Sequence, residues 1–160
     1  MFISNRKKVF SLSIFFILIG IFLRYYQLNF ENYWFDELLD FWVADPNISY
    51  KATFLRRELI NDQTPYLFQI LLKIYLKVFG YDPVIGRHVP LFFGVLSIPL
   101  VGILSYQIAK NNSFLLTILL VSINIYLIKY SQETRTYTLV FLLSIINLIF
   151  YYRIISSDLI

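Results

Sequence analysis

Apolar segments long enough to cross a bilayer recur along this chain, and they limit its fold more than any other feature. A membrane-spanning helix needs roughly 20 mostly apolar residues. The segments that approach this length are residues 9–28, 84–109, 113–128 and 137–152. Because lipid offers the backbone no hydrogen-bond partner, such segments must be helical. The sequence therefore predicts an all-α, multi-pass membrane protein, a single membrane domain over residues 1–160 with about four transmembrane helices.

The composition excludes several other classes of protein. Hydrophobic residues make up 58% of the chain and charged residues only 15%, whereas about a quarter of a soluble domain is charged. The formal net charge is +4, but the basic residues flank the apolar segments instead of forming the basic face that nucleic acid requires. With no cysteine and the single histidine His88, a disulfide framework and a zinc site of cysteine or histidine ligands are excluded.

Residues 29–83 form the longest connection, an outer loop in which we expect interfacial helices. Within it, residues 65–79 are apolar but carry Gln69, Lys73 and Lys77 at every fourth position. That spacing places the polar residues on one side of a helix. The pattern predicts a helix that lies in the membrane surface and does not cross it.

The positive-inside rule favours the same arrangement. If residues 65–79 lie flat, the Asp36 loop and the Glu133 loop share the outer side, and the basic residues at the span ends share the cytoplasmic side. These basic residues are Arg6, Lys7, Lys8, Lys110 and Arg153. If residues 65–79 cross, the Glu133 loop moves inside. We therefore expect a protein of the plasma (cytoplasmic) membrane with its amino terminus in the cytoplasm.

Asp36 and Glu37 are the strongest candidates for chemistry. They follow the first apolar segment directly, behind Tyr33, Trp34 and Phe35. Ionisable groups at a bilayer are costly unless they are hydrated, paired or functional. The alternative is a solvated pair, or carboxylates that favour the start of the next helix through its dipole.

Short motifs follow one another in an order that resembles a known family. Residues 33–37 read Tyr-Trp-Phe-Asp-Glu, 62–66 read Asp-Gln-Thr-Pro-Tyr, 86–90 read Gly-Arg-His-Val-Pro and 130–137 read Tyr-Ser-Gln-Glu-Thr-Arg-Thr-Tyr. This series is similar to the multi-pass C-type glycosyltransferases, which include the protein O-mannosyltransferases and the aminoarabinose transferases. The last motif is the most distinctive and looks like the Tyr-Ser-Gln-Glu-x-Arg-x-Tyr signature of bacterial members. The chain departs from the family at His88 and Leu91, where leucine and serine are usual.

The resemblance implies transfer of a sugar from a polyprenyl-phosphate-linked donor to a lipid, glycan or protein acceptor at the outer membrane face. Asp36 would be the base that takes the proton of the acceptor. Glu37 would orient the acceptor or help to hold a divalent cation. Arg87 and Arg135 would stabilise the departing phosphate. The remaining substrate-binding candidates are Trp34, for sugar contact, and Glu133.

Other interpretations stay open beside this one. Glu133 and Arg135 could simply pair with each other or with another loop charge, and Arg87 could be an interfacial anchor. Family members usually run to several hundred residues, so the chain resembles an amino-terminal portion, and a non-catalytic membrane subunit or remnant is the alternative to an enzyme. A small transporter would need polar residues inside the spans, and these hold almost none.

Overall fold

The structure is a computed structural model that describes residues 2–61, 64–109 and 111–157. Over this part the chain consists of helices joined by loops. Within these ranges there is no β-strand. The helices are α1 (Phe2–Tyr25), α2 (Phe35–Val43), α3 (Tyr50–Leu59), α4 (Tyr66–Phe79), α5 (Pro83–Gly86), α6 (His88–Ala109), α7 (Asn111–Ile123), α8 (Ile125–Ser131) and α9 (Tyr137–Ser157). The prediction of an all-α fold is confirmed.

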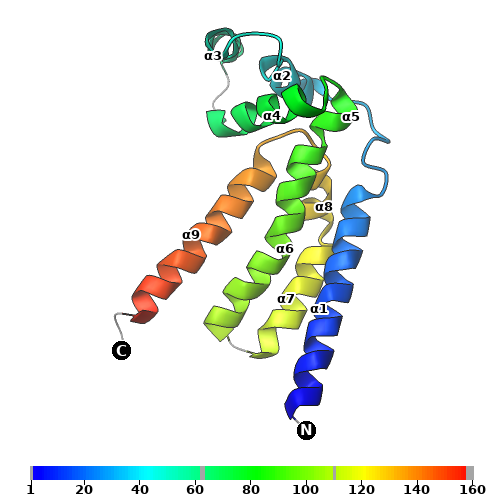
Figure 1. The fold of residues 1–160 in the computed structure, drawn as a ribbon, viewed down its shortest axis with the longest axis vertical. Coiled ribbons are helices and arrows are strands. Elements are labelled where there is room, and N and C mark those ends of the chain that lie inside the picture. The colour runs from blue at the N-terminus through cyan, green and yellow to red at the C-terminus, as the bar shows by residue number, and fades with distance from the viewer. Residues whose placement is uncertain (1, 62–63, 110, 158–160) are drawn as a thin grey trace.

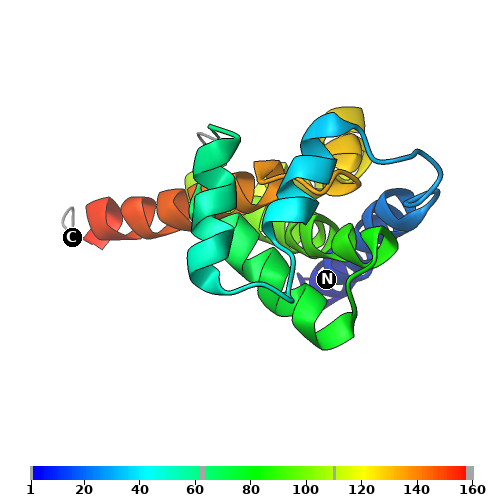
Figure 2. The same cartoon turned by 90° about the horizontal axis from the view of Figure 1, so that it is seen from above.

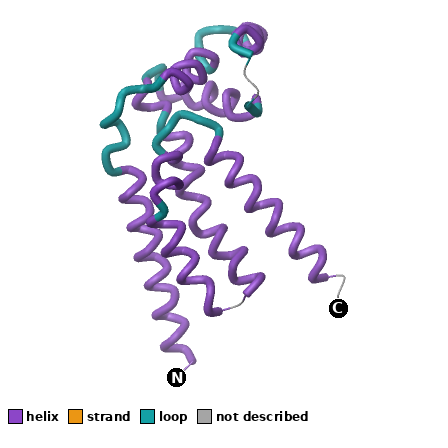
Figure 3. The backbone as a smooth tube through the Cα atoms, turned by 180° about the vertical axis from the view of Figure 1, so that it is seen from behind, coloured by secondary structure: helices purple, strands orange, loops and turns teal. Residues whose placement is uncertain are grey.

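The long helices α1, α6, α7 and α9 stand side by side as a bundle (Figures 1 and 3). The stretches Lys7–Tyr25, Pro83–Ala109 and Tyr137–Ser156 are each long and apolar enough to cross a membrane. The multi-pass membrane architecture is therefore confirmed. The start of α1 and the end of α9 lie at one end of the bundle, and α2 to α5 form a cap over the other end. Lys110, one of the predicted cytoplasmic residues, lies outside the described residues.

The predicted span 113–128 is a broken helix. Ser113–Ile123 and Ile125–Ser131 meet at an angle of 56°, and together they can serve as a fourth span. Asn124 begins the second piece by accepting a hydrogen bond from the Leu127 amide on its side-chain oxygen, at 3.0 Å. The main-chain oxygens freed by the break accept from a buried arginine of α1, since Arg24 Nη2 lies 2.9 Å from the Val121 oxygen.

The first helix ends earlier than the sequence predicts. It stops at Tyr25 and not at Leu28, because Gln27 has a positive φ of 56° that a helix cannot contain. The chain turns there, and Leu28 is only 4% exposed. The apolar run therefore continues past the end of the helix, and its last residue, Leu28, is buried.

Helix α4 lies across the end of the bundle (Figures 1 and 2) and is not among the helices long and apolar enough to span a membrane. The flat orientation of residues 65–79 in a membrane stays a prediction, and the face of the helix that the structure buries includes polar residues. Gln69 and Lys73 are buried, whereas Leu67, Ile74 and Val78 are exposed. The polar side faces the rest of the cap, where Lys73 Nζ donates to the main-chain oxygens of residues 45 and 48. Burial lowers the pKa of Lys73, although nearby Asp45 opposes the shift.

A small hydrophobic core joins the cap to the bundle. It contains Phe68, Leu72 and Leu76 from α4, together with Ala44, Val89 of α6 and Leu139 of α9. Because these residues come from the cap and from two membrane helices, the core fixes the height and the rotation of α2 and α4 over the bundle. The polar residues described next depend on that placement.

Candidate functional site

The cap is connected to the bundle by a buried ion pair between Glu37 of α2 and Arg87 at the start of α6. Arg87 Nε lies 3.2 Å from Glu37 Oε1, and Arg87 Nη2 lies 3.0 Å from Oε2. The side chains are only 1% and 5% exposed, respectively. Arg87 also donates to the main-chain oxygens of Leu28 and Glu31, at 2.9 and 2.7 Å. Such a fork on a carboxylate gives both strength and a fixed orientation.

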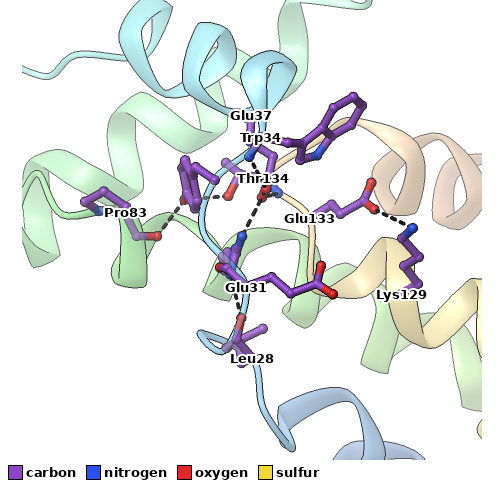
Figure 4. A network of polar contacts seen from close by, with 10 residues as sticks. Leu28, Glu31, Trp34, Glu37, Pro83, Lys129, Glu133 and Thr134 are labelled. Atoms are coloured by element: carbon purple, nitrogen blue, oxygen red, sulfur yellow. Dashed lines mark hydrogen bonds and ion pairs between the residues drawn. The ribbon is translucent and has the colours of Figure 1, made fainter.

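The segment between α8 and α9 docks on the same carboxylate. The Thr134 amide donates to Glu37 Oε1 at 2.6 Å, and the Thr134 hydroxyl lies 2.6 Å from the Tyr33 hydroxyl. The Tyr33 hydroxyl in turn donates to the Pro83 oxygen at 2.5 Å. Figure 4 labels Glu37, Thr134 and Pro83 in this network. Burial raises the pKa of Tyr33 well above its usual range, so this phenol stays neutral and serves as a hydrogen-bonding group.

A second buried pair lies one turn further along α2. Arg135 Nη1 is 2.8 Å from Asp40 Oδ2, and Gln69 Nε2 of α4 donates to Asp40 Oδ1 at 2.8 Å. Arg135 also lies near Asp36, with 3.9 Å between Nη2 and Oδ2. The Asp40 side chain is 1% exposed, whereas that of Asp36 is 39% exposed. Asp36 is therefore the accessible carboxylate of this group.

An open cavity of about 690 Å³ lies between the cap and the bundle, beside the Glu37–Arg87 pair. The residues around it come from the loop after α1, the start of α2, α8 and the segment after α8. Those used below are Glu31, Trp34, Lys129 and Glu133, which Figure 4 labels. The cavity combines an exposed indole with carboxylates and an ammonium group, which suits a polar ligand that carries hydroxyl groups.

Among the residues that line this cavity, Glu133 has a carboxyl group with a shifted pKa. Burial raises its pKa above the usual range, and the nearby Glu37 and Glu31 raise it further, whereas Lys129 and Arg135 lower it. Its contact with Lys129 is long, at 3.9 Å. A carboxyl group with a raised pKa beside a cavity holds its proton more readily than an unperturbed one and is a candidate for proton exchange with a ligand.

The structure brings together most of the residues that the sequence singles out. Trp34, Glu37, Arg87 and Glu133 line the one cavity. Asp36 and Arg135 are not among its lining residues and instead meet beside Asp40. The alternative pairing of Glu133 with Arg135 is not among the ion pairs within the described residues, where each has a different partner.

Two residues of this site, Asp40 and Thr134, were not predicted from the sequence. Asp40 lies one helical turn from Asp36 and Glu37, and that spacing on one helix face could have identified it. Thr134 holds Glu37 through its main-chain amide, and a main-chain contact leaves no trace in residue type. For the divalent cation, no group of three or more His, Asp or Glu side chains able to hold a metal is found within the described ranges.

Comparisons with protein-family models, with curated proteins and with solved structures found no match to this chain. A function for this chain is therefore inferred from its site and from the motifs of its sequence.

Proposed function

We propose that this protein transfers a sugar from a polyprenyl-phosphate-linked donor to an acceptor hydroxyl or amine at the membrane surface. The observation that carries the proposal is the cavity at the cap–bundle boundary, which gathers Trp34, Glu37, Arg87 and Glu133 from segments far apart in the sequence. A lipid-linked sugar presents a polar head at this boundary and leaves its chain in the bilayer. A cavity half in the cap and half at the helix ends matches that geometry.

Asp36 acts as the base in this proposal. It accepts the acceptor proton while the acceptor oxygen or nitrogen bonds to the anomeric carbon and the bond from that carbon to the phosphate oxygen breaks, so that polyprenyl phosphate leaves with the electron pair. Asp36 does not line the cavity, but its side chain is 39% exposed and is therefore open to an acceptor that approaches from outside the cavity. Arg135 Nη2 lies 3.9 Å from Asp36 Oδ2 and helps to hold the side chain in place.

Glu37 is a positioning residue in this scheme. Its oxygens are occupied by Arg87 and by the Thr134 amide, so they are not free to take a proton from the acceptor. The pair instead holds the loop of Glu133 against the start of α2, where Trp34 offers an indole face, 45% exposed, to the sugar.

Replacement of Asp36 by asparagine tests the base. The protein is reconstituted in vesicles with a panel of polyprenyl-phosphate hexoses, pentoses and aminopentoses, and release of polyprenyl phosphate is measured. We expect Asp36→Asn to lower the rate by about 100-fold or more, the usual range for loss of a general base. Glu58→Gln, which changes an exposed acid of α3, is the matched control. An unchanged rate in Asp36→Asn would contradict the base role.

A non-catalytic membrane subunit is the second candidate function. It is favoured by the pairing of Glu37 with Arg87 and of Asp40 with Arg135, because a purely structural network also neutralises its own charges. Under this function no donor in the panel is consumed by the wild type, and the cavity would instead receive a partner chain.

A further inference from the structure

Arg24 is a buried cation for which no carboxylate partner occurs among the described residues. It lies in the last turn of α1, within the span Lys7–Tyr25, and is 1% exposed. Arg87, which is buried, and Arg135, whose side chain is 12% exposed, each pair with a carboxylate at 2.8–3.0 Å. An uncompensated charge at membrane depth is costly, and such residues mark functional sites.

The hydrogen bonds of Arg24 leave one edge of its guanidinium unused. Nη1 donates to the Gly20 and Ser122 oxygens at 3.0 and 3.1 Å, and Nη2 donates to the Val121 oxygen. Nε has no partner. Because the group has five N–H donors, Nε and one hydrogen of Nη2 remain. Nε and Nη2 are the same two atoms with which Arg87 grips the carboxylate of Glu37.

A second, smaller cavity lies beside this guanidinium. It has a volume of about 200 Å³ and is lined by Arg24, Gly94 of α6, Ser131 of α8 and Thr138 of α9, among others. A Cβ atom on Gly94 would lie 2.0 Å from Ser131 Oγ and 3.6 Å from Arg24 Nε, so glycine at this position lets Ser131 and Arg24 pack closely against α6. The ends of α1, α6, α8 and α9 that surround it meet just beneath the cap (Figure 1).

Thr138 supplies an independent sign of a missing ligand. Its side chain is 3% exposed, it lines the same cavity, and its hydroxyl oxygen has no hydrogen-bond partner. A buried hydroxyl without a partner costs free energy. A ligand with acceptor oxygens would satisfy both this hydroxyl and the free edge of Arg24.

We propose that this cavity binds the phosphate group of a membrane lipid, with Arg24 and Thr138 as its donors. The guanidinium edge matches two oxygens of a phosphate. The cavity shares Tyr130 and Tyr137 with the larger cavity, so a lipid held here places its next group toward Trp34 and Glu133. This inference deepens the proposed function, because the lipid that fits both cavities is the phosphate-linked sugar donor.

The test measures binding without turnover, so its outcome is separate from that of the transfer assay. Delipidated protein in detergent is titrated with undecaprenyl phosphate, with undecaprenol, which lacks the phosphate, and with phosphatidylglycerol, and bound lipid is counted by native mass spectrometry. Thr138→Val removes the hydroxyl and keeps the shape, and the fold tolerates it because that hydroxyl has no partner to lose. Thr136→Val is the matched control, since Thr136 is also buried with a partnerless hydroxyl but does not line the cavity.

We expect undecaprenyl phosphate to bind at least about tenfold more tightly than undecaprenol. Thr138→Val should weaken that binding by about tenfold, the effect of losing one hydrogen bond to a charged group, and Thr136→Val should leave it unchanged. Arg24→Lys, which keeps the charge but loses the two-pronged edge, should weaken it as well. Equal binding of phosphatidylglycerol with the same dependence on Thr138 would support the phosphate site and identify its ligand as bulk phospholipid. Equal binding of undecaprenol, or no effect of Thr138→Val, would overturn the proposal.

Discussion

Glu37 and Arg87, 50 residues apart in the chain, meet through two hydrogen bonds of 3.2 and 3.0 Å in the interior of the protein. The pair connects the cap to the first turn of α6, and the Thr134 amide adds the segment before α9 to the same carboxylate. Three segments therefore share one acidic group. The position of the cap over the larger cavity depends on this carboxylate.

Glu37→Gln should destabilise the protein strongly. The change leaves the Arg87 guanidinium buried without its counter-charge, and loss of one partner of a buried ion pair costs about 3–5 kcal/mol. Thermal unfolding in detergent measures the effect. Glu58→Gln, on the exposed surface of α3, is the control and should change the melting temperature little. A Glu37→Gln protein as stable as that control would show that the pair does not hold the cap.

Asp40→Asn should cost less, about 1.5–3 kcal/mol, the contribution of a hydrogen bond to a charged group. Asparagine keeps an oxygen for Gln69 but removes the charge that faces Arg135. Arg135 still has Asp36 at 3.9 Å as a partial substitute. We therefore expect the double variant Asp36→Asn with Asp40→Asn to lose more stability than the sum of the single variants. Strict additivity would mean that Asp36 does not compensate.

The sequence predicts the bundle well because hydrophobic length is a property of each segment alone. Residues 84–109 and 137–152 match α6 and α9 within a few residues, and α4 is a separate helix that is not among the candidate spans. The direction in which α4 faces could not be predicted, because Gln69 and Lys73 are buried by partners in other segments. The periodicity of a helix separates its faces but does not say which face is covered.

The candidate site, like the fold, can be predicted from the sequence only in part. The motifs identify Trp34, Glu37, Arg87 and Glu133, which the fold then brings to one cavity. The free edge of Arg24 depends instead on the break between α7 and α8, whose carbonyls occupy the rest of the guanidinium. That break involves neither proline nor glycine, since Asn124 marks it, so the sequence gives little warning of it.

Glu133→Gln should change how stability depends on pH. Burial raises the pKa of Glu133 in the folded protein above its usual value of 4.5. The folded state therefore binds this proton more tightly than the unfolded state, and the resulting stability is full below the unfolded pKa and is lost as the pH rises through the folded pKa. Glutamine lacks this loss. We expect the melting temperature of Glu133→Gln, relative to wild type, to rise between pH 4 and about pH 7; a constant difference would contradict the raised pKa.

Single cysteines test which segments share a side of the membrane, and the chain suits this test because it contains no cysteine. Asn32 and Lys129 line the same cavity under the cap, whereas Arg153 lies near the end of α9, at the opposite end of the bundle (Figure 1). With a membrane-impermeant thiol reagent on intact cells, Asn32→Cys and Lys129→Cys should behave alike. Arg153→Cys should show the opposite behaviour, with detergent-treated cells as the control for reactivity.

This labelling pattern follows from the number of crossings. Asn32 and Lys129 share a side when the number of crossings between them is even. Because α6 is one crossing, just one of α4 and the bent pair α7–α8 must be the other, and only the pair is long and apolar enough among these two. A positive-inside orientation further predicts that Asn32 and Lys129 react in intact cells and that Arg153 does not. Opposite labelling of Asn32 and Lys129 would mean that α4 and the bent pair both cross the bilayer or that neither does, and the cavity that unites Trp34 with Glu133 could not then form.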